Sequence, residues 1–505
     1  MRKELTRRDF LKLASLVPIV KILAPRIPNP EKNNLPNILI LLFDAWSAKN
    51  VSLYGYPRNT TPYLERLAQK AIVYHNHYAG GYFTVPGTTS LLTGVLAWQH
   101  LYFRTKYKLA PYYKEHNLFS AFPEYKRIAY SHNLLANDVL NFLTDSLDKL
   151  KPWQELYKWP NPAQSLFFRD NDISSIGWIR TMDTTDTGAA SSVFLSRLLS
   201  YLIDRANQKQ AEIFPLGIPR SGQSFHFILE DAIDWLANFV KSEEEPFLAY
   251  YHLFPPHDPY NTRFEYHQHF KDDGYAPEEK PEHFLSAGIS HANNLINRQQ
   301  YDEYLLYVDA EIDRLFALLE STGKLENTWI LLTSDHGEIF ERGLKAHLKP
   351  SFYDPGAKVP LLIFPPGQKN RIDIHVPTSA IDLLPTLKTI LGQKTPEWAE
   401  GQVLPPFNQD DTENRAINIP DCREYEAGEP FRHASLMLRK GRYKLIHHFG
   451  SSFGYERLKG NPLSELYDLE NDPEEITNLF DQETELGNAL LGELYAKMRE
   501  LSVKE

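Results

Sequence analysis

Uninterrupted apolar runs in this chain predict strands that are buried on both faces. The first run occupies residues 37–43, and similar runs follow at 246–253, 329–333 and 359–364. Strands without polar alternation are typical of parallel sheets that helices cover on both sides. These four segments therefore predict the strands of a mostly parallel central sheet.

Helical patterns separate these runs. Thr61 followed by Pro62 combines a favourable N-cap with a proline at the first helical position, which predicts a helix from that point. Residues 225–240 have amphipathic spacing, and in residues 301–320 apolar side chains recur on one face while Asp and Glu occupy the other. A short helix is expected to end near Gly94. The alternation of strands and helices predicts an α/β fold in which helices flank the central sheet.

The pattern changes at about residue 396. Short segments at 434–438 and 443–447 read as antiparallel strands, and a helix is expected over residues 483–501. We therefore expect a main domain over residues 37–395, followed by a small α+β subdomain at 396–505. Within the main domain, the irregular and aromatic-rich stretch 150–225 is interpreted as an insertion over the sheet edge or the cleft.

The amino terminus predicts a targeting segment instead of a folded element. Residues 6–12 read Thr-Arg-Arg-Asp-Phe-Leu-Lys, which resembles a twin-arginine export signal. We expect residues 1–28 to be this signal and 29–36 to be a linker, which places the protein on the periplasmic or extracellular face. No clear cleavage site follows, so an uncut segment that associates with the membrane stays an alternative. Lys21 interrupts the apolar run, so a full spanning helix is not expected.

Composition and charge exclude several classes of function. The net charge of -11 leaves no basic footprint, so nucleic acid is not an expected partner. Cys422 is the only cysteine, which excludes an intrachain disulfide and a cysteine-based zinc cluster.

Polar side chains directly follow three of the predicted strands. Asp44 ends the first strand, His257 follows the second, and Asp335 and His336 follow the third. In open α/β sheets, ligands bind at the carboxyl ends of the strands, so these side chains should converge on one rim. A carboxylate beside an imidazole is a ligand pair suited to Zn²⁺ or Mn²⁺. The alternative is a polar turn in which Asp335 caps a helix and His336 is merely exposed.

Several motifs occur together in one order. Residues 90–94 read Ser-Leu-Leu-Thr-Gly, and residues 333–338 read Thr-Ser-Asp-His-Gly-Glu. Arg-Tyr-Lys-Leu-Ile follows at 442–446, and Glu-Leu-Tyr-Asp-Leu-Glu-Asn-Asp-Pro at 465–473. With these motifs the chain resembles the sulfatase branch of the alkaline phosphatase superfamily over nearly all of residues 36–480.

The resemblance implies a set of site residues. It implies a single divalent metal ion held by four residues, namely Asp44, Thr84, Asp335 and His336. It implies a catalytic set in which Thr84 is the nucleophile and two cationic groups stabilise charge, namely His257 and Lys349. Asn76 and His347 would contact the substrate, although for His347 a second-metal ligand and a solvated loop residue stay open.

The chain departs from the family pattern in three places. Sulfatases mature a Cys or Ser in a Cys/Ser-x-Pro-x-Arg motif into formylglycine, whereas residues 84–88 here read Thr-Val-Pro-Gly-Thr. Formylglycine is therefore not expected, and Thr84 resembles the nucleophile of phosphoethanolamine and phosphoglycerol transferases. The family's paired aspartates are Asp44 and Ala45 here, which together with His336 favours Zn²⁺ or Mn²⁺ over Ca²⁺. Residues 131–133, Ser-His-Asn, occupy the place of the Gly-Lys-x-His motif.

The sequence thus predicts an exported, metal-dependent hydrolase that cleaves a sulfate or phosphate ester through Thr84. The expected substrate is an anionic ester on a glycan, a lipid head group or a small molecule. Two alternatives stay open: a transferase that moves a phospho-alcohol head group between lipid and glycan, and a catalytically silent binding protein with the sulfatase fold.

Overall fold

The computed structural model describes residues 35–158, 212–221, 225–408, 414–424, 431–451 and 455–502, with isolated positions at 198, 201, 202 and 205. The predicted export signal, nearly all of the linker and most of the 150–225 insertion therefore lie outside the described residues. In the described part of the chain, no helix is both long and apolar enough to cross a membrane.

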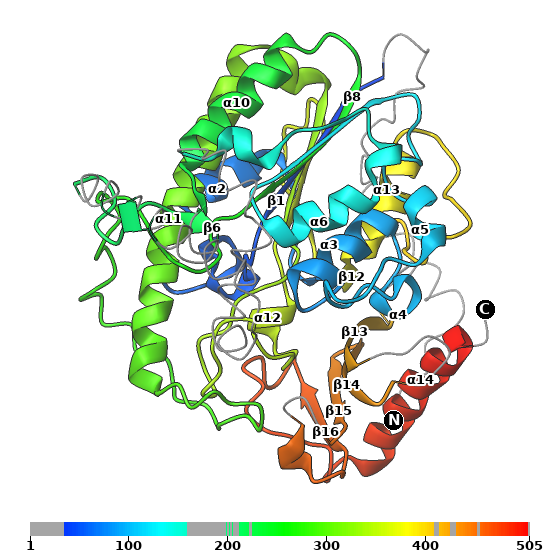
Figure 1. Ribbon diagram of the computed structural model, residues 1–505. Coiled ribbons are helices and arrows are strands. Elements are labelled where there is room, and N and C mark those ends of the chain that lie inside the picture. The colour runs from blue at the N-terminus through cyan, green and yellow to red at the C-terminus, as the bar shows by residue number, and fades with distance from the viewer. Residues whose placement is uncertain are drawn as a thin grey trace, which may run out of the picture.

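An eight-stranded sheet forms the centre of the main domain (Figure 1). In spatial order its strands are β11 (Ile372–Ile374), β2 (Ile72–Tyr74), β10 (Leu361–Phe364), β9 (Thr328–Thr333), β1 (Asn37–Phe43), β8 (Phe247–Leu253), β4 (Lys126–Ser131) and β5 (Lys149–Leu150). Strand β10 runs antiparallel to both of its neighbours, and the other described strands of the sheet run in one direction. The predicted mostly parallel sheet is confirmed.

Strand β1 shows why these residues form a central strand. All seven of its residues are buried, and it pairs in parallel with β8 on one side and β9 on the other. Its odd-numbered apolar residues pack with helices α2 (Pro62–Leu67), α10 (Leu229–Ser242) and α11 (His291–Ser321). Its even-numbered residues pack with α3 (Thr84–Thr93), α6 (Leu134–Phe142) and α13 (Leu383–Ile390) on the opposite face (Figure 1). An apolar side chain at every position is therefore required by burial on both faces.

A second, antiparallel sheet follows in the carboxy-terminal part. Its strands are β13 (Ile417–Glu424), β14 (His433–Lys440), β15 (Tyr443–Phe449) and β16 (Leu463–Asp468). One face packs against α14 (Thr484–Ser502), the red helix of Figure 1, through Leu490 and Leu494. The other face packs against the main domain through residues such as Met437 and Ile446. The predicted small α+β part is thus confirmed as a sheet with one covering helix.

The remaining elements are short connections. Strands β3 (His77–Tyr78) and β12 (Thr378–Ser379) form a parallel pair, and β6 (Arg220–Ser221) and β7 (Phe225–His226) an antiparallel pair. The other short helices are α4 (Ala97–His100), α5 (Pro111–Glu115), α12 (Asp354–Ala357) and the 3₁₀ turns η1 (Ala48–Asn50), η2 (Ser52–Tyr54), η3 (Ala68–Lys70), η4 (Thr144–Ser146), η5 (Trp153–Leu156), η7 (Lys324–Asn327), η8 (Ala380–Asp382) and η9 (Glu456–Leu458).

Two predicted helix boundaries were wrong. The helix predicted over 225–240 begins only at Leu229, because Phe225 and His226 pair with β6 as a short strand. The helix predicted over 301–320 begins earlier, at His291, where the Ser290 side chain accepts a hydrogen bond from the Asn293 N–H. Its first turns are polar, so the apolar periodicity could not reveal them.

Candidate active site

The carboxyl ends of β1 and β9 bring the first three predicted residues together. Because the two strands are parallel neighbours with Leu42 opposite Thr333, Asp44 emerges beside Asp335 and His336. The His336 Nε2 atom lies 3.5 Å from Asp44 Oδ1 and 3.6 Å from Asp335 Oδ2. All three side chains are buried. This burial excludes the alternative in which His336 is merely an exposed residue of a polar turn.

Backbone N–H groups fix the Asp335 carboxylate. Its Oδ1 atom accepts hydrogen bonds from the N–H groups of Ala45 at 3.3 Å and of His336 at 3.1 Å. Ser334 ties the same turn to β1, since its hydroxyl donates to the His336 carbonyl and accepts from the Trp46 N–H. One carboxylate oxygen of Asp335 is thus anchored, and the other points into the cluster.

Thr84 enters the cluster as the first residue of α3. Its Oγ1 atom lies 3.4 Å from His336 Nε2, and the side chain is 2% exposed. Gly87 makes this approach possible, because a Cβ atom at that position would stand 2.2 Å from the Asp335 carbonyl oxygen. The start of α3 therefore packs directly onto the end of β9, which places the hydroxyl beside the two carboxylates.

The sequence prediction missed Asn133. Its Nδ2 atom donates to Asp44 Oδ2 and lies 3.4 Å from Thr84 Oγ1. Its Oδ1 atom accepts the Leu135 N–H at 2.7 Å as the N-cap of α6. One amide thus caps a helix and orients two cluster residues. Its position directly after the Lys126–Ser131 strand was the available signal.

His252 was also missed. Its Nε2 atom lies 3.1 Å from Asp44 Oδ2 and 3.8 Å from Asp335 Oδ2, and its Nδ1 atom lies 3.2 Å from the Tyr250 hydroxyl. The residue sits inside the apolar segment 247–253, where a single histidine is easily read as core. Only its place next to the last residue of β8, beside Asp44, could have indicated a role.

Two further histidines extend the cluster from His336. The His347 ring centroid lies 4.2 Å from that of His336, and the His257 ring centroid lies 4.8 Å from that of His347. His347 is buried and hydrogen-bonds through Nδ1 to Glu338 Oε1 at 3.0 Å, whereas His257 is half-buried. Burial, helped by the neighbouring His336 and His257, holds the pKa of His347 well below its usual range. Burial raises the pKa of Glu338 to about 8, although His257 and His336 oppose the shift.

The last two predicted residues lie differently. Lys349 is half-buried in the same loop as His347, two residues further along the chain. Asn76 is not brought into the cluster, because the turn after β2 is separated from β9 by β10. Its Nδ2 atom donates to the His375 carbonyl at 2.6 Å, and it lines a separate cavity.

The cluster fits a divalent metal ion. Asp44 Oδ1 and Asp335 Oδ2 are buried and have no hydrogen-bond partner among the described residues. The His336 Nδ1–H donates to the Gly337 carbonyl at 2.9 Å, which leaves the Nε2 lone pair directed at the carboxylates. Burial acts to raise the pKa of Asp44, but His257, His252 and His336 outweigh it and the pKa is lowered, so the carboxylate is ionised. Two carboxylates and one imidazole are side chains that proteins use to bind divalent metal ions.

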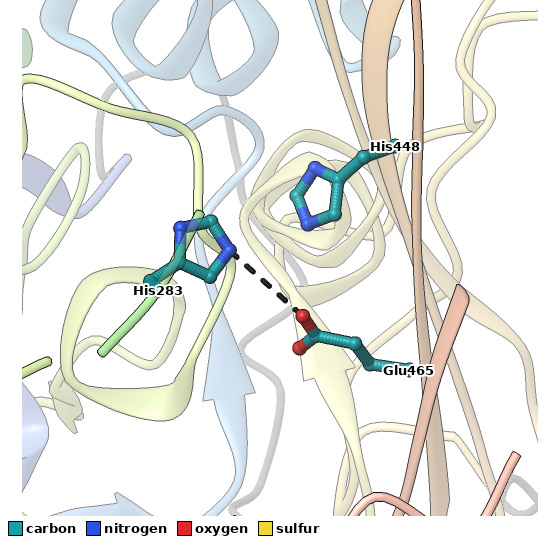
Figure 2. A group of neighbouring side chains, drawn as sticks. All are labelled: His283, His448 and Glu465. Atoms are coloured by element: carbon teal, nitrogen blue, oxygen red, sulfur yellow. Dashed lines mark ion pairs between the residues drawn. The ribbon is translucent and has the colours of Figure 1, made fainter. Parts of the chain in front are cut away.

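A second buried group, shown in Figure 2, fits a metal ion less well. His283, His448 and Glu465 point toward one another, and His283 Nε2 lies 3.9 Å from Glu465 Oε1. The Leu285 N–H donates to His283 Nδ1 at 3.1 Å, so a neutral ring carries its proton on Nε2. That proton occupies the atom that would bind the ion. We therefore interpret this group as packing between the carboxy-terminal sheet and the main domain.

The chain is similar to known proteins over most of its length. The family model described as Sulfatase matches residues 36–393, and the one described as N-sulphoglucosamine sulphohydrolase, C-terminal, matches residues 346–504. The choline-sulfatase of Rhizobium meliloti is 25% identical over 475 residues, which cover 88% of this chain and 82% of that protein.

Solved structures share the fold. The phosphonate monoester hydrolase of Agrobacterium radiobacter superposes with a TM-score of 0.65 at 19% identity, covering 93% of this chain and 96% of that one. A protein solved in complex with its substrate D-glucosamine-2-N,6-O-disulfate superposes with a TM-score of 0.61 at 17% identity, covering 94% of this chain and 100% of that one.

Proposed function

Because the chain belongs to the sulfatase family of ester hydrolases, we propose that it cleaves a sulfate or phosphate ester with Thr84 as nucleophile and without formylglycine. The observation that carries the proposal is the place of the Thr84 hydroxyl. It lies 3.4 Å from His336 Nε2, inside a buried cluster with two carboxylates. Cys422, the one residue that could otherwise supply a modifiable thiol, lies on β13 in the second sheet.

A divalent metal ion would be held by Asp44, Asp335, His336 and the Thr84 hydroxyl. When bound, a metal ion in this donor set supplies charge that polarises an ester oxygen and lowers the pKa of a coordinated hydroxyl. The imidazole of His336 favours Zn²⁺ or Mn²⁺ over Ca²⁺, which prefers oxygen ligands.

The surrounding residues position the nucleophile and the anion. Asn133 holds the Thr84 hydroxyl and the Asp44 carboxylate through one amide group. Thr84 is the first residue of α3, so the positive end of this helix faces the transferred anionic group. These contacts orient the reactants before the bond breaks, and such orientation accounts for a large part of enzymatic rate enhancement.

His257 is the proposed donor of a proton to the leaving oxygen. In the imidazolium form of His257, Nδ1–H donates to the Asp258 carbonyl at 2.7 Å, and Nε2–H is the proton that can be transferred to the leaving oxygen. Lys349, in the loop with His347, would stabilise charge on the transferred group. His347, from the same loop, would contact the substrate.

A sulfated glycan is the substrate class that the similarities favour. The carboxy-terminal family model is described by a sulfated amino sugar, and a protein of the same fold was solved with a glucosamine disulfate. A preference for small esters over glycans is the alternative outcome that the assay below detects. The relatives named above are hydrolases, which supports hydrolysis over head-group transfer.

Thr84→Ala and Thr84→Ser test the nucleophile. The assay uses aryl sulfate, phosphate monoester, phosphate diester, phosphonate and sulfated disaccharide substrates, with alcohol acceptors added to detect transfer. We expect Thr84→Ala to abolish cleavage and Thr84→Ser to retain part of it, with a covalent adduct on residue 84 visible by mass spectrometry. Full activity of Thr84→Ala would remove this residue from the mechanism.

Export is proposed from residues 6–12. Replacing the pair with Arg7→Lys and Arg8→Lys should trap the protein in the cytoplasm of a bacterium that has twin-arginine export. Fractionation of cells that carry either form measures this. Unchanged export of the double variant would contradict the proposal, and release of the wild type from membranes without detergent would exclude an uncut anchor.

A further inference from the structure

A cavity lies between the main domain and the carboxy-terminal sheet. It has a volume of 750 Å³ and is lined by residues of η1, of α12 and of the end of β14. None of the residues of the Asp44–His336 cluster lines it. Among its lining side chains are five cations, Lys49, Lys358, Arg439, Lys440 and Arg442, against two carboxylates. Three of these cations form ion pairs: Lys49 with Glu474, Lys440 with Glu493, and Arg442 with Asp468 and Glu470. Arg439 and Lys358 form no ion pair with the described residues, so they are the cations that remain for a ligand of the cavity.

Arg439 is the residue that sets this cavity apart. It is 7% exposed, and among the described residues its Nε and Nη1 atoms have no hydrogen-bond partner. Its guanidinium carbon lies 5.2 Å from the centroid of the Tyr78 ring, a cation–π contact that leaves the N–H groups unmet. A buried guanidinium with two nitrogen atoms that lack hydrogen bonds is unfavourable, so a partner of negative charge is expected.

The carboxylates near Arg439 already have other partners. Lys444 lies opposite Arg439 across the β14–β15 pair, and its Nζ atom binds Asp354 at 2.8 Å and Glu475 at 2.7 Å. The Tyr78 hydroxyl also donates to Asp354 at 3.2 Å. The protein thus neutralises Lys444 internally but leaves Arg439 facing the cavity.

Lys358 adds a second cation from the opposite wall. Burial lowers the pKa of its ammonium group to about 8; Asp354 opposes this shift, and Arg439 and Lys49 strengthen it. Lys358 closes α12, where its N–H donates to the Asp354 carbonyl and its carbonyl accepts the Ala48 N–H, so its backbone is fixed. Lys358 and Arg439 thus line the same cavity although they belong to separate elements.

We propose that this cavity is an oxyanion-binding site in which Arg439 and Lys358 hold a sulfate or phosphate group. A guanidinium offers paired N–H donors that match two oxygens of such a group, and an ammonium adds a point charge. The anion has two possible sources. It is either free inorganic anion, such as the released product, or a second anionic group on the glycan whose ester is cleaved in the active site. The second source rests on the proposed function, whereas the binding itself does not.

Lysine acetylation of the full chain tests the binding. Sodium sulfate should slow the acetylation of Lys358 at pH 8, measured by peptide mass spectrometry, whereas sodium chloride of equal ionic strength should not. Arg439→Met should weaken the protection by about tenfold or more, because a charge-assisted contact is lost. Lys126→Met, which removes a cation paired with Glu243 at the far end of the sheet, is the matched control. Equal acetylation of Lys358 in sulfate and chloride would overturn the proposal.

The thermal stability of the protein distinguishes an anion-binding role of Arg439 from a purely structural one. A buried charge without a partner destabilises the fold, so Arg439→Met should unfold at the same temperature as the wild type or higher in sulfate-free buffer. Sulfate should raise the unfolding temperature of the wild type more than that of Arg439→Met. A variant that unfolds much earlier and keeps the full sulfate effect would assign Arg439 to packing and refute the site.

A sulfated oligosaccharide and its desulfated form then distinguish the two sources. If the sulfated form protects Lys358 and Arg439→Met raises KM for it but not for an aryl sulfate, the anion is part of the substrate. If only inorganic sulfate protects, the site binds the free anion. Protection by neither probe refutes the proposal, and this result leaves the Thr84 assay unaffected, so the two failures are distinguishable.

Discussion

Replacing Gly87 by alanine is the sharpest test of how the proposed nucleophile, Thr84, is placed. The added Cβ would stand 2.2 Å from the Asp335 carbonyl oxygen, so α3 and the end of β9 must separate by about 1 Å before the contact is tolerable. Thr84 is on the first turn of α3 and Asp335 is in the cluster, so this separation pulls the Thr84 hydroxyl away from the carboxylates. A misplacement of about 1 Å costs on the order of 10²-fold in rate.

We therefore expect kcat/KM of Gly87→Ala to fall about 100-fold, which corresponds to about 2.7 kcal/mol of transition-state stabilisation. Overpacking should lower the free energy of unfolding by about 1–3 kcal/mol, so the variant should still fold. The assay is ester hydrolysis at saturating metal, with circular dichroism to establish folding.

Gly492→Ala is the matched control. Gly492 lies within α14 and no atom stands within 4 Å of the Cβ that would be added, so the same substitution should leave activity unchanged and stabilise the helix by up to about 1 kcal/mol. A folded Gly87→Ala protein with wild-type kcat/KM would refute the close approach of α3 to β9 as the device that positions Thr84.

Three further predictions follow from the same structure. The wild type should contain one Zn²⁺ or Mn²⁺ per chain by elemental analysis, lost in Asp335→Ala and kept in Glu465→Gln; loss in the latter instead would make the His283 group the metal site. Asn133→Ser keeps an N-cap acceptor for α6 but removes the amide to Thr84, so activity should fall about 10–100-fold with little change in stability. Burial lowers the pKa of His100 to about 3, below the unfolded value of 6.5, so its contribution to stability is present above 6.5 and lost as pH falls. Urea unfolding of His100→Gln should show a pH slope smaller by about 1.4 kcal/mol per unit between about pH 6 and pH 5, and an unchanged slope would contradict a buried neutral histidine.

The sequence was sufficient to predict the site residues that directly follow strands. A strand buried on both faces must be apolar at every position, so residues 37–43 and 329–333 stand out, and the first polar residue after each must lie at the rim. Asp44 and the Asp335–His336 pair therefore follow from local pattern and from the rule that parallel strands share one rim. Thr84 was predicted from the Ser-Leu-Leu-Thr-Gly motif that follows it at residues 90–94.

Tertiary structure alone decided which other side chains reach that rim. Strand order is a long-range property, and no local pattern shows that β10 separates β2 from β9 and keeps Asn76 away from the cluster. In the same way, β4 and β8 deliver Asn133 and His252 because they pair in that order beside β1. The cavity at Arg439 forms between the carboxy-terminal sheet and segments of the main domain that are distant in sequence, so it exists only once these parts are packed together. Local periodicity determines which side chains are buried, whereas strand pairing and packing between segments distant in sequence determine which side chains come into contact.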